Sequence, residues 1–212
     1  MCWNSSSSLG FFIGGTLLTT IILSLATIQQ KWYLVAFCLG WYWVLGMQLA
    51  EYFLWTHSKD FNAGYAAFFL NIMQIPIVYL VFASVSPNYQ VPTWSLSLAS
   101  LVLLAYLSGI AWMGKDLSRQ DFMVNSTHQS HLRYPWWDKM KFGGMLYLLS
   151  LIALFLLLAR PLSWTLWTIA TIVAFFMVSY IFYRPYLASM WCFLVVIMPL
   201  FAFGYSMIPQ TF

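Results

Sequence analysis

The chain is 212 residues long, carries a formal net charge of +4, and is 62% hydrophobic with only 7% charged residues. Soluble domains carry roughly 25% charged residues, and a soluble chain of this length could not bury so much apolar side chain, so the composition excludes a soluble globular protein. The positive charge does not indicate a nucleic-acid partner, because the basic residues stand beside expected helix ends and form no basic face with base-stacking groups.

The charged residues divide the chain into long uncharged segments at 1–30, 32–50, 61–114, 142–159, 161–183 and 185–212. A helix that crosses a bilayer needs about 20 apolar residues. Proline breaks helices because it lacks the backbone N–H, so the segment 61–114 divides at Ser86-Pro87-Asn88 and Pro92. We therefore expect an all-α integral membrane protein, a single seven-transmembrane helix bundle with a polar loop at 115–140. The expected helices are 9–28, 32–55, 62–84, 93–113, 141–159, 163–183 and 186–207.

Counting seven crossings sorts the loops between the two membrane faces. The N-terminus and residues 56–61, 115–140 and 184–185 fall on one face, and Lys31, Arg160 and the C-terminus fall on the other. The first face carries the remaining basic residues, which are Lys59, Lys115, Arg119, Arg133, Lys139, Lys141 and Arg184. The positive-inside rule then predicts a cytoplasmic N-terminus and a C-terminus on the opposite side. All five acids and all three histidines lie on or near the same cytoplasmic face, where we expect the chemistry.

Small and aromatic residues suggest how the helices pack in the bilayer. Gly10 and Gly14 form a small-xxx-small face, and Gly143-Gly144 opens the fifth expected helix; both permit close helix contact, within one chain or in a homo-oligomer. Amphipathic rings favour the headgroup layer. Six of them stand at expected helix starts, namely Trp32, Tyr33, Trp94, Trp136, Trp137 and Trp164.

Two pairs of segments hint at an internal repeat. The stretch 69–76 is similar to 193–199, and the stretch 51–55 before it is similar to 179–183. Helices one to three and five to seven would then be copies joined by helix four, a 3+1+3 parallel repeat. Such repeats are common in transporters, with the substrate site near the bilayer midplane.

Glu51 is the most informative single residue, because it lies about one turn inside the second expected helix. A carboxylate inside a membrane is costly and marks a functional site by default. Gln48 lies on the same helical face. Asn71 and Gln74 lie mid-helix just before Pro76, which would kink the third helix and free a carbonyl. We predict that these four polar residues line a substrate pocket open to the cytoplasmic side; helix-to-helix hydrogen bonding is the alternative for Asn71 and Gln74.

Nucleophilic and metal-binding residues give a second, weaker hypothesis. His128 and His131 have an H-x-x-H spacing that could bind zinc with His57 and either Asp121 or Glu51, but they lie in a loop without helical period, so we predict no metal site. Cys2 could act as an activated thiolate. The three cysteines are too scattered for a disulfide framework. The seventh expected helix contains no lysine, which excludes a Schiff-base retinal protein.

Three short blocks carry a resemblance. Met1-Cys2-Trp3-Asn4 before a serine run, the block 47–55, and Ser189-Met190-Trp191-Cys192 together resemble an uncharacterised multi-pass membrane protein family of large DNA viruses and some microbes. Members of that family tend to begin Met-Cys-Trp-Ser, whereas this chain has Asn4. The resemblance implies no activity, only that these blocks form a shared site. The helix count also resembles the 3+1+3 transporters and receptors, although their proline-glutamine motif is missing.

Three functions remain open at this point. The leading expectation is a small membrane transporter or carrier for a small solute, with Glu51 as a proton-coupled or cation-binding group in the polar pocket. The alternative is an intramembrane hydrolase or transferase acting on a lipid or lipid-linked substrate, with Cys2, Glu51 or the histidines as catalytic groups. A third alternative is a receptor or partner protein that presents Trp136-Trp137 from an ordered 115–140 segment.

Overall fold

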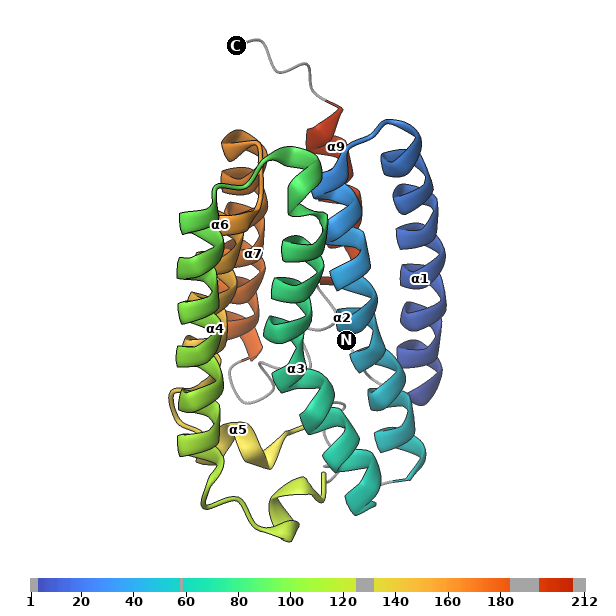
Figure 1. Cartoon of the computed structure of the whole chain (residues 1–212). Coiled ribbons are helices and arrows are strands. Elements are labelled where there is room, and N and C mark those ends of the chain that lie inside the picture. Colours follow the sequence, from blue (N-terminus) through green and yellow to red (C-terminus); the bar gives the residue numbers. More distant parts are fainter. Residues whose placement is uncertain (1–3, 58, 125–131, 184–194, 208–212) are drawn as a thin grey trace.

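The structure is a computed structural model that describes residues 4–57, 59–124, 132–183 and 195–207 (Figure 1). The described residues form α-helices and short 3-10 turns and no β-strand, which confirms the all-α prediction. The α-helices are α1 (Ser5–Ile28), α2 (Trp32–Thr56), α3 (Phe61–Val85), α4 (Thr93–Gly114), α5 (Pro135–Lys139), α6 (Gly143–Leu158), α7 (Leu162–Tyr183) and α9 (Met198–Ser206). The 3-10 turns are η1 (Ser86–Tyr89), η2 (Arg119–Phe122) and η4 (Val195–Ile197).

Five of the described helices, α1 to α4 and α7, are long and apolar enough to cross a bilayer, which identifies a multi-pass membrane protein. Helix α6 is apolar but has 16 residues, a length of about 24 Å. The expected seventh helix at 186–207 lies partly outside the described residues, so the count of seven crossings stays a prediction. Helix α1 begins before its expected start because the Asn4 side chain caps it, accepting a hydrogen bond from the Ser7 N–H at 2.8 Å.

The long helices stand side by side and alternate in direction (Figure 1). The α2–α3 connection, η2 and α5 lie at one end of the bundle, which we call the loop end. The α1–α2, α3–α4 and α6–α7 connections lie at the other, which we call the opposite end. This grouping is the one that counting crossings predicts from the sequence.

Helix α2 occupies the centre of the bundle between α1 and α3, while α4 packs on α6 and α7 on α9. In α2, 67% of the apolar span is buried, compared with 17% in α4. Outward-facing leucines are no defect here, because lipid tails are as apolar as leucine side chains. Polar side chains that the sequence places in α2 are therefore held inside protein and away from lipid.

Pro76 lies inside α3 and deprives the Ile72 carbonyl, four residues earlier, of its usual helical N–H donor. The buried Tyr106 of α4 replaces that donor, since its hydroxyl hydrogen-bonds the Ile72 carbonyl at 3.0 Å. Trp43 of α2 donates its indole N–H to the neighbouring Leu70 carbonyl at 2.9 Å. The freed carbonyl expected from the sequence is thus present, and an aromatic side chain of another helix satisfies it.

The segment 115–140 is less of a polar loop than expected. Phe122, Val124, Leu132, Tyr134 and Trp136 are all buried. Where η2 crosses α3 the backbones almost touch, because a Cβ on Gly64 would lie 1.6 Å from the Phe122 carbonyl oxygen. The loop end is therefore packed against the bundle.

Several sequence expectations about packing are wrong. Trp136 and Trp164 are fully buried and do not reach a headgroup layer, and the Trp164 indole donates to the Ala202 carbonyl at 2.9 Å. Gly10 and Gly14 have no neighbouring atom within 4 Å of where a Cβ would stand, so they mediate no helix contact among the described residues of one chain, and a contact in a homo-oligomer stays a prediction.

The 3+1+3 repeat also stays a prediction, because residues 193 and 194 of the similar stretch lie outside the described part of the chain. The prolines of the two similar stretches occupy different positions in their helices. Pro76 is in a helix interior, whereas Pro199 is in the first turn of α9, where proline fits without a kink.

Candidate functional site

Glu51 lies in the last third of α2 and is 0% exposed. Its Oε1 accepts a hydrogen bond from the Tyr134 hydroxyl at 2.5 Å, and Tyr134 is itself buried. Gln48, one turn earlier in α2, is also 0% exposed. The structure therefore places the predicted carboxylate inside the protein, with a phenol from the loop end against it.

Asn71 and Gln74 belong to the buried stripe of α3, which recurs every three or four residues. The Tyr147 hydroxyl of α6 donates to Gln74 Oε1 at 2.6 Å. The Asn71 amide nitrogen is buried and has no hydrogen-bond partner among the described residues. Helix-to-helix hydrogen bonding thus explains Gln74, whereas Asn71 keeps an unused donor in the bundle interior.

The cross-helix register shows how these four residues lie relative to one another. A Cβ on Gly46 would stand 3.7 Å from Leu70 Cδ2, and one on Gly40 would stand 3.5 Å from Val78 Cγ2. With the helical rise of about 1.5 Å per residue, Gln48 and Asn71 then share nearly one depth, with Glu51 nearer the loop end and Gln74 nearer the opposite end. Along the bundle axis the four residues span about 12 Å, and we call this set the polar column.

An aromatic plug, defined here as Tyr134 and Trp136, covers the loop-end foot of the polar column. The two rings stack with centroids 4.8 Å apart and an interplanar angle of 9°. Trp136 also packs against Phe68 of α3 and Phe122 of η2, with ring centroids 5.8 Å and 6.4 Å apart, respectively. In this structure the polar column is closed at the loop end, where the sequence predicted an opening.

An ion pair holds the two halves of the loop end together. Lys139 of α5 contacts Asp121 of η2 at 2.8 Å, and Ser118 donates both its N–H and its hydroxyl to the same carboxylate. Burial alone would raise the pKa of Asp121, but the hydrogen bonds from Lys139 and Ser118 outweigh it and lower the pKa to about 2. A second ion pair joins Arg133 and Asp138 at 2.8 Å; it is exposed and contributes little to stability.

The residues of the second hypothesis are not brought together by the described structure. His57 is exposed beyond the end of α2, and its Nδ1 hydrogen-bonds the Thr56 hydroxyl at 2.9 Å. Cys2, His128 and His131 lie outside the described residues. No group of three histidine, cysteine or acidic residues that could hold a metal occurs in the part of the chain that the structure describes.

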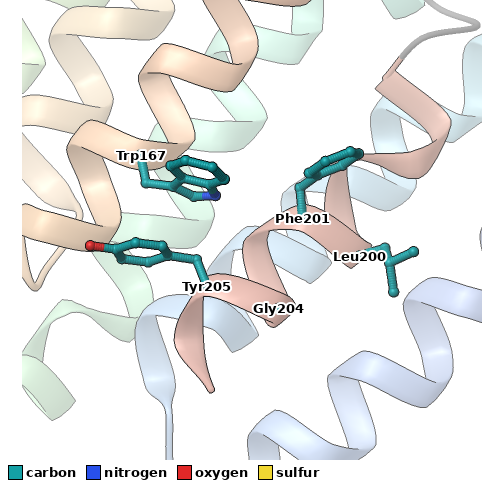
Figure 2. Close-up of a pocket in the computed structure, with 5 residues that line it drawn as sticks. All are labelled: Trp167, Leu200, Phe201, Gly204 and Tyr205. Carbon is teal, nitrogen blue, oxygen red and sulfur yellow. The ribbon is translucent and has the colours of Figure 1, made fainter. Parts of the chain in front are cut away.

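A separate apolar groove of about 320 Å³ lies between α7 and α9 (Figure 2). Its lining residues are Trp167, Leu200, Phe201, Gly204 and Tyr205. The Trp167 and Tyr205 rings stack at 5.3 Å with an interplanar angle of 13°. This lining suits an apolar group and supplies no charge, so the groove is chemically unlike the polar column.

No protein-family model, curated protein or solved structure matches this chain. The resemblance of its N-terminal and internal blocks to a viral and microbial membrane family therefore stays a prediction. Sequence reasoning missed the two tyrosine partners, Tyr134 and Tyr147. A signal for the first was present, because Tyr134-Pro135-Trp136-Trp137 is an aromatic run inside a segment otherwise rich in charge.

Proposed function

We propose that the protein is a small polytopic carrier that moves a small polar solute across the membrane, with Glu51 as its proton- or cation-binding group. The observation that carries this proposal is a completely buried carboxylate at the foot of an intramembrane polar column. Such a group is costly to keep in a membrane and is retained where it binds or relays an ion.

The finer features of the carrier belong to the same proposal. The chain would cross the membrane seven times, with the loop end in the cytoplasm and helices one to three repeated in five to seven. The structure would be the state that is closed towards the cytoplasm. Movement of the aromatic plug away from Glu51 would then open the polar column to the solute.

The rival functions have less support from the described residues. The enzyme hypothesis uses Cys2 or the histidines with Glu51; His57 is exposed while Glu51 is fully buried, and Cys2, His128 and His131 lie outside the described residues. The receptor hypothesis needs Trp136-Trp137 presented to a partner, but Trp136 is 0% exposed and Trp137 is half-buried. The carrier proposal makes use of Glu51, Gln48 and Asn71 where the fold places them.

Uptake by proteoliposomes tests the proposal. The purified protein is reconstituted and incubated with a defined mixture of amino acids, sugars, nucleosides and organic acids. Mass spectrometry then measures the vesicle contents, while a trapped pH-sensitive dye reports proton entry. Glu51→Gln keeps the side-chain shape and a hydrogen-bond acceptor for Tyr134 but removes the charge. Asp116→Asn is the matched control, because it neutralises an exposed acid at the same end.

We expect the wild-type protein and the Asp116→Asn variant to admit the same solute, and Glu51→Gln to reduce its uptake to the level of protein-free vesicles. Unchanged uptake in Glu51→Gln would refute the assigned role of Glu51. A wild-type protein that admits neither a solute nor protons would refute the carrier function.

A further inference from the structure

Four basic side chains at the loop end form no salt bridge with any residue that the structure describes. The ion pairs of Arg133 and Lys139 account for Asp138 and Asp121. The other described cations of this end are all exposed, and none forms a salt bridge with a described residue; they are Lys59, Lys115, Arg119 and Lys141. Because Asp60 caps α3 by accepting from the Asn62 N–H at 2.7 Å, Asp116 is the remaining described acid that could screen them.

Aromatic side chains lie beside three of these cations. The Lys115 ammonium lies 5.8 Å from the ring centre of Trp112, which is 68% exposed at the end of α4. The Arg119 guanidinium lies 5.0 Å from the ring centre of Phe61. Lys141 is followed by Phe142, which is 69% exposed. Exposed tryptophan rings such as Trp112 favour the membrane interface, and long basic side chains beside them extend their charge into it.

The two cations of the opposite end are used differently. The Lys31 ammonium donates to the Ser206 carbonyl at 2.6 Å, at the end of α9. The Arg160 guanidinium donates to the Leu156 and Ala159 carbonyls at 3.2 and 2.7 Å, at the end of α6. Basic side chains commonly satisfy the last carbonyls of a helix in this way. These two cations stabilise helix ends, so the charge available to lipid is concentrated at the loop end.

We infer that the loop end binds anionic phospholipid headgroups through Lys59, Lys115, Arg119 and Lys141. The lipid phosphate and its additional negative charge complement cations that form no salt bridge with a described residue, at the depth that Trp112 defines. This inference does not rest on the carrier function. It also assigns the loop end to the more anionic leaflet of the membrane.

Native mass spectrometry tests the inference by comparing the lipids that the protein retains. The protein is taken from mixed micelles that contain equal amounts of phosphatidylglycerol and phosphatidylcholine. Each cation near the surface is worth about a fivefold preference for anionic lipid. The double variant Lys115→Ala/Arg119→Ala should therefore lower the preference for phosphatidylglycerol about 25-fold. The matched double variant Lys31→Ala/Arg160→Ala removes the same charge at the opposite end and should leave the preference unchanged.

Raising the ionic strength should weaken the preference of the wild-type protein, because the interaction is between exposed charges. Equal retention of the two lipids by the wild-type protein would overturn the inference. So would a preference that survives Lys115→Ala/Arg119→Ala, or one that both double variants reduce to the same extent.

Discussion

The Tyr106–Ile72 hydrogen bond offers a test of how the bundle tolerates a proline inside α3. Tyr106→Phe removes a hydroxyl that is fully buried and changes little else in side-chain volume. The Ile72 carbonyl then has neither the N–H that Pro76 lacks nor the phenol that replaces it. The predicted effect is therefore the free energy of leaving one buried carbonyl unsatisfied.

A buried polar group that loses its partner costs about 1–3 kcal/mol, while interhelical hydrogen bonds in membranes average about 0.6 kcal/mol and reach about 1.7. We expect Tyr106→Phe to lower the free energy of unfolding by about 1–2 kcal/mol. Pro76→Ala restores the helical N–H at position 76. In that background Tyr106→Phe should cost less than about 0.5 kcal/mol, because the helix itself now satisfies the Ile72 carbonyl.

Reversible unfolding in mixed micelles of rising dodecyl sulfate content measures all four proteins of this cycle, with circular dichroism and tryptophan fluorescence as independent probes. The coupling energy between the two positions should be about 1 kcal/mol. An equal cost of Tyr106→Phe in both backgrounds would show that the phenol does not substitute for the missing donor.

Two further predictions concern the loop end. Gly64→Ala should destabilise the protein by about 3 kcal/mol or more, because the new Cβ would stand 1.6 Å from the backbone carbonyl oxygen of Phe122. Gly144→Ala is the control. It has open space around its Cβ and should be nearly neutral in the same unfolding assay. A loss of similar size in both would contradict the close approach. Asp121 has a folded-state pKa of about 2, below its ordinary value of 3.8, so its stabilisation is present above about pH 4 and is lost as the pH falls towards 2. Asp121→Asn should therefore cost about 2 kcal/mol at pH 6 and clearly less at pH 3; a cost independent of pH would contradict the ion-paired carboxylate.

The sequence predicts the elements of this fold better than their contacts. Long uncharged segments interrupted by Pro87, Pro92 and Pro161 locate α1 to α4, α6 and α7, because chain length per crossing and proline chemistry are local properties. Helix α5 lies in the segment 115–140 that the sequence predicts as a polar loop. The burial of four polar side chains could also be predicted, because lipid does not tolerate polar groups inside the bilayer. These side chains are Gln48, Glu51, Asn71 and Gln74.

Which side chains complete the polar column could not be predicted. Tyr134 is 83 residues away from Glu51, and Tyr147 is 73 residues away from Gln74. Such pairings depend on how helices pack and leave no periodic pattern in the sequence. Trp136 and Trp164 were assigned to the headgroup layer for a related reason, because a tryptophan at a helix start has the same sequence pattern whether it faces lipid or protein.

The most direct test of whether Tyr134 closes the polar column is the rate at which a cysteine thiol placed in the column reacts with a maleimide. In nanodiscs, Gln48→Cys is introduced after replacement of the native cysteines, and a water-soluble maleimide is added. Gln48 is 0% exposed, so labelling should be slow. Tyr134→Ala removes the ring and the hydrogen bond to Glu51, and it should accelerate labelling at least about tenfold by making local opening easier. Trp112→Ala, which removes an exposed ring at the same end, should leave the rate unchanged. Fast labelling with Tyr134 intact, or a rate that Tyr134→Ala does not raise, would contradict a column closed by the aromatic plug.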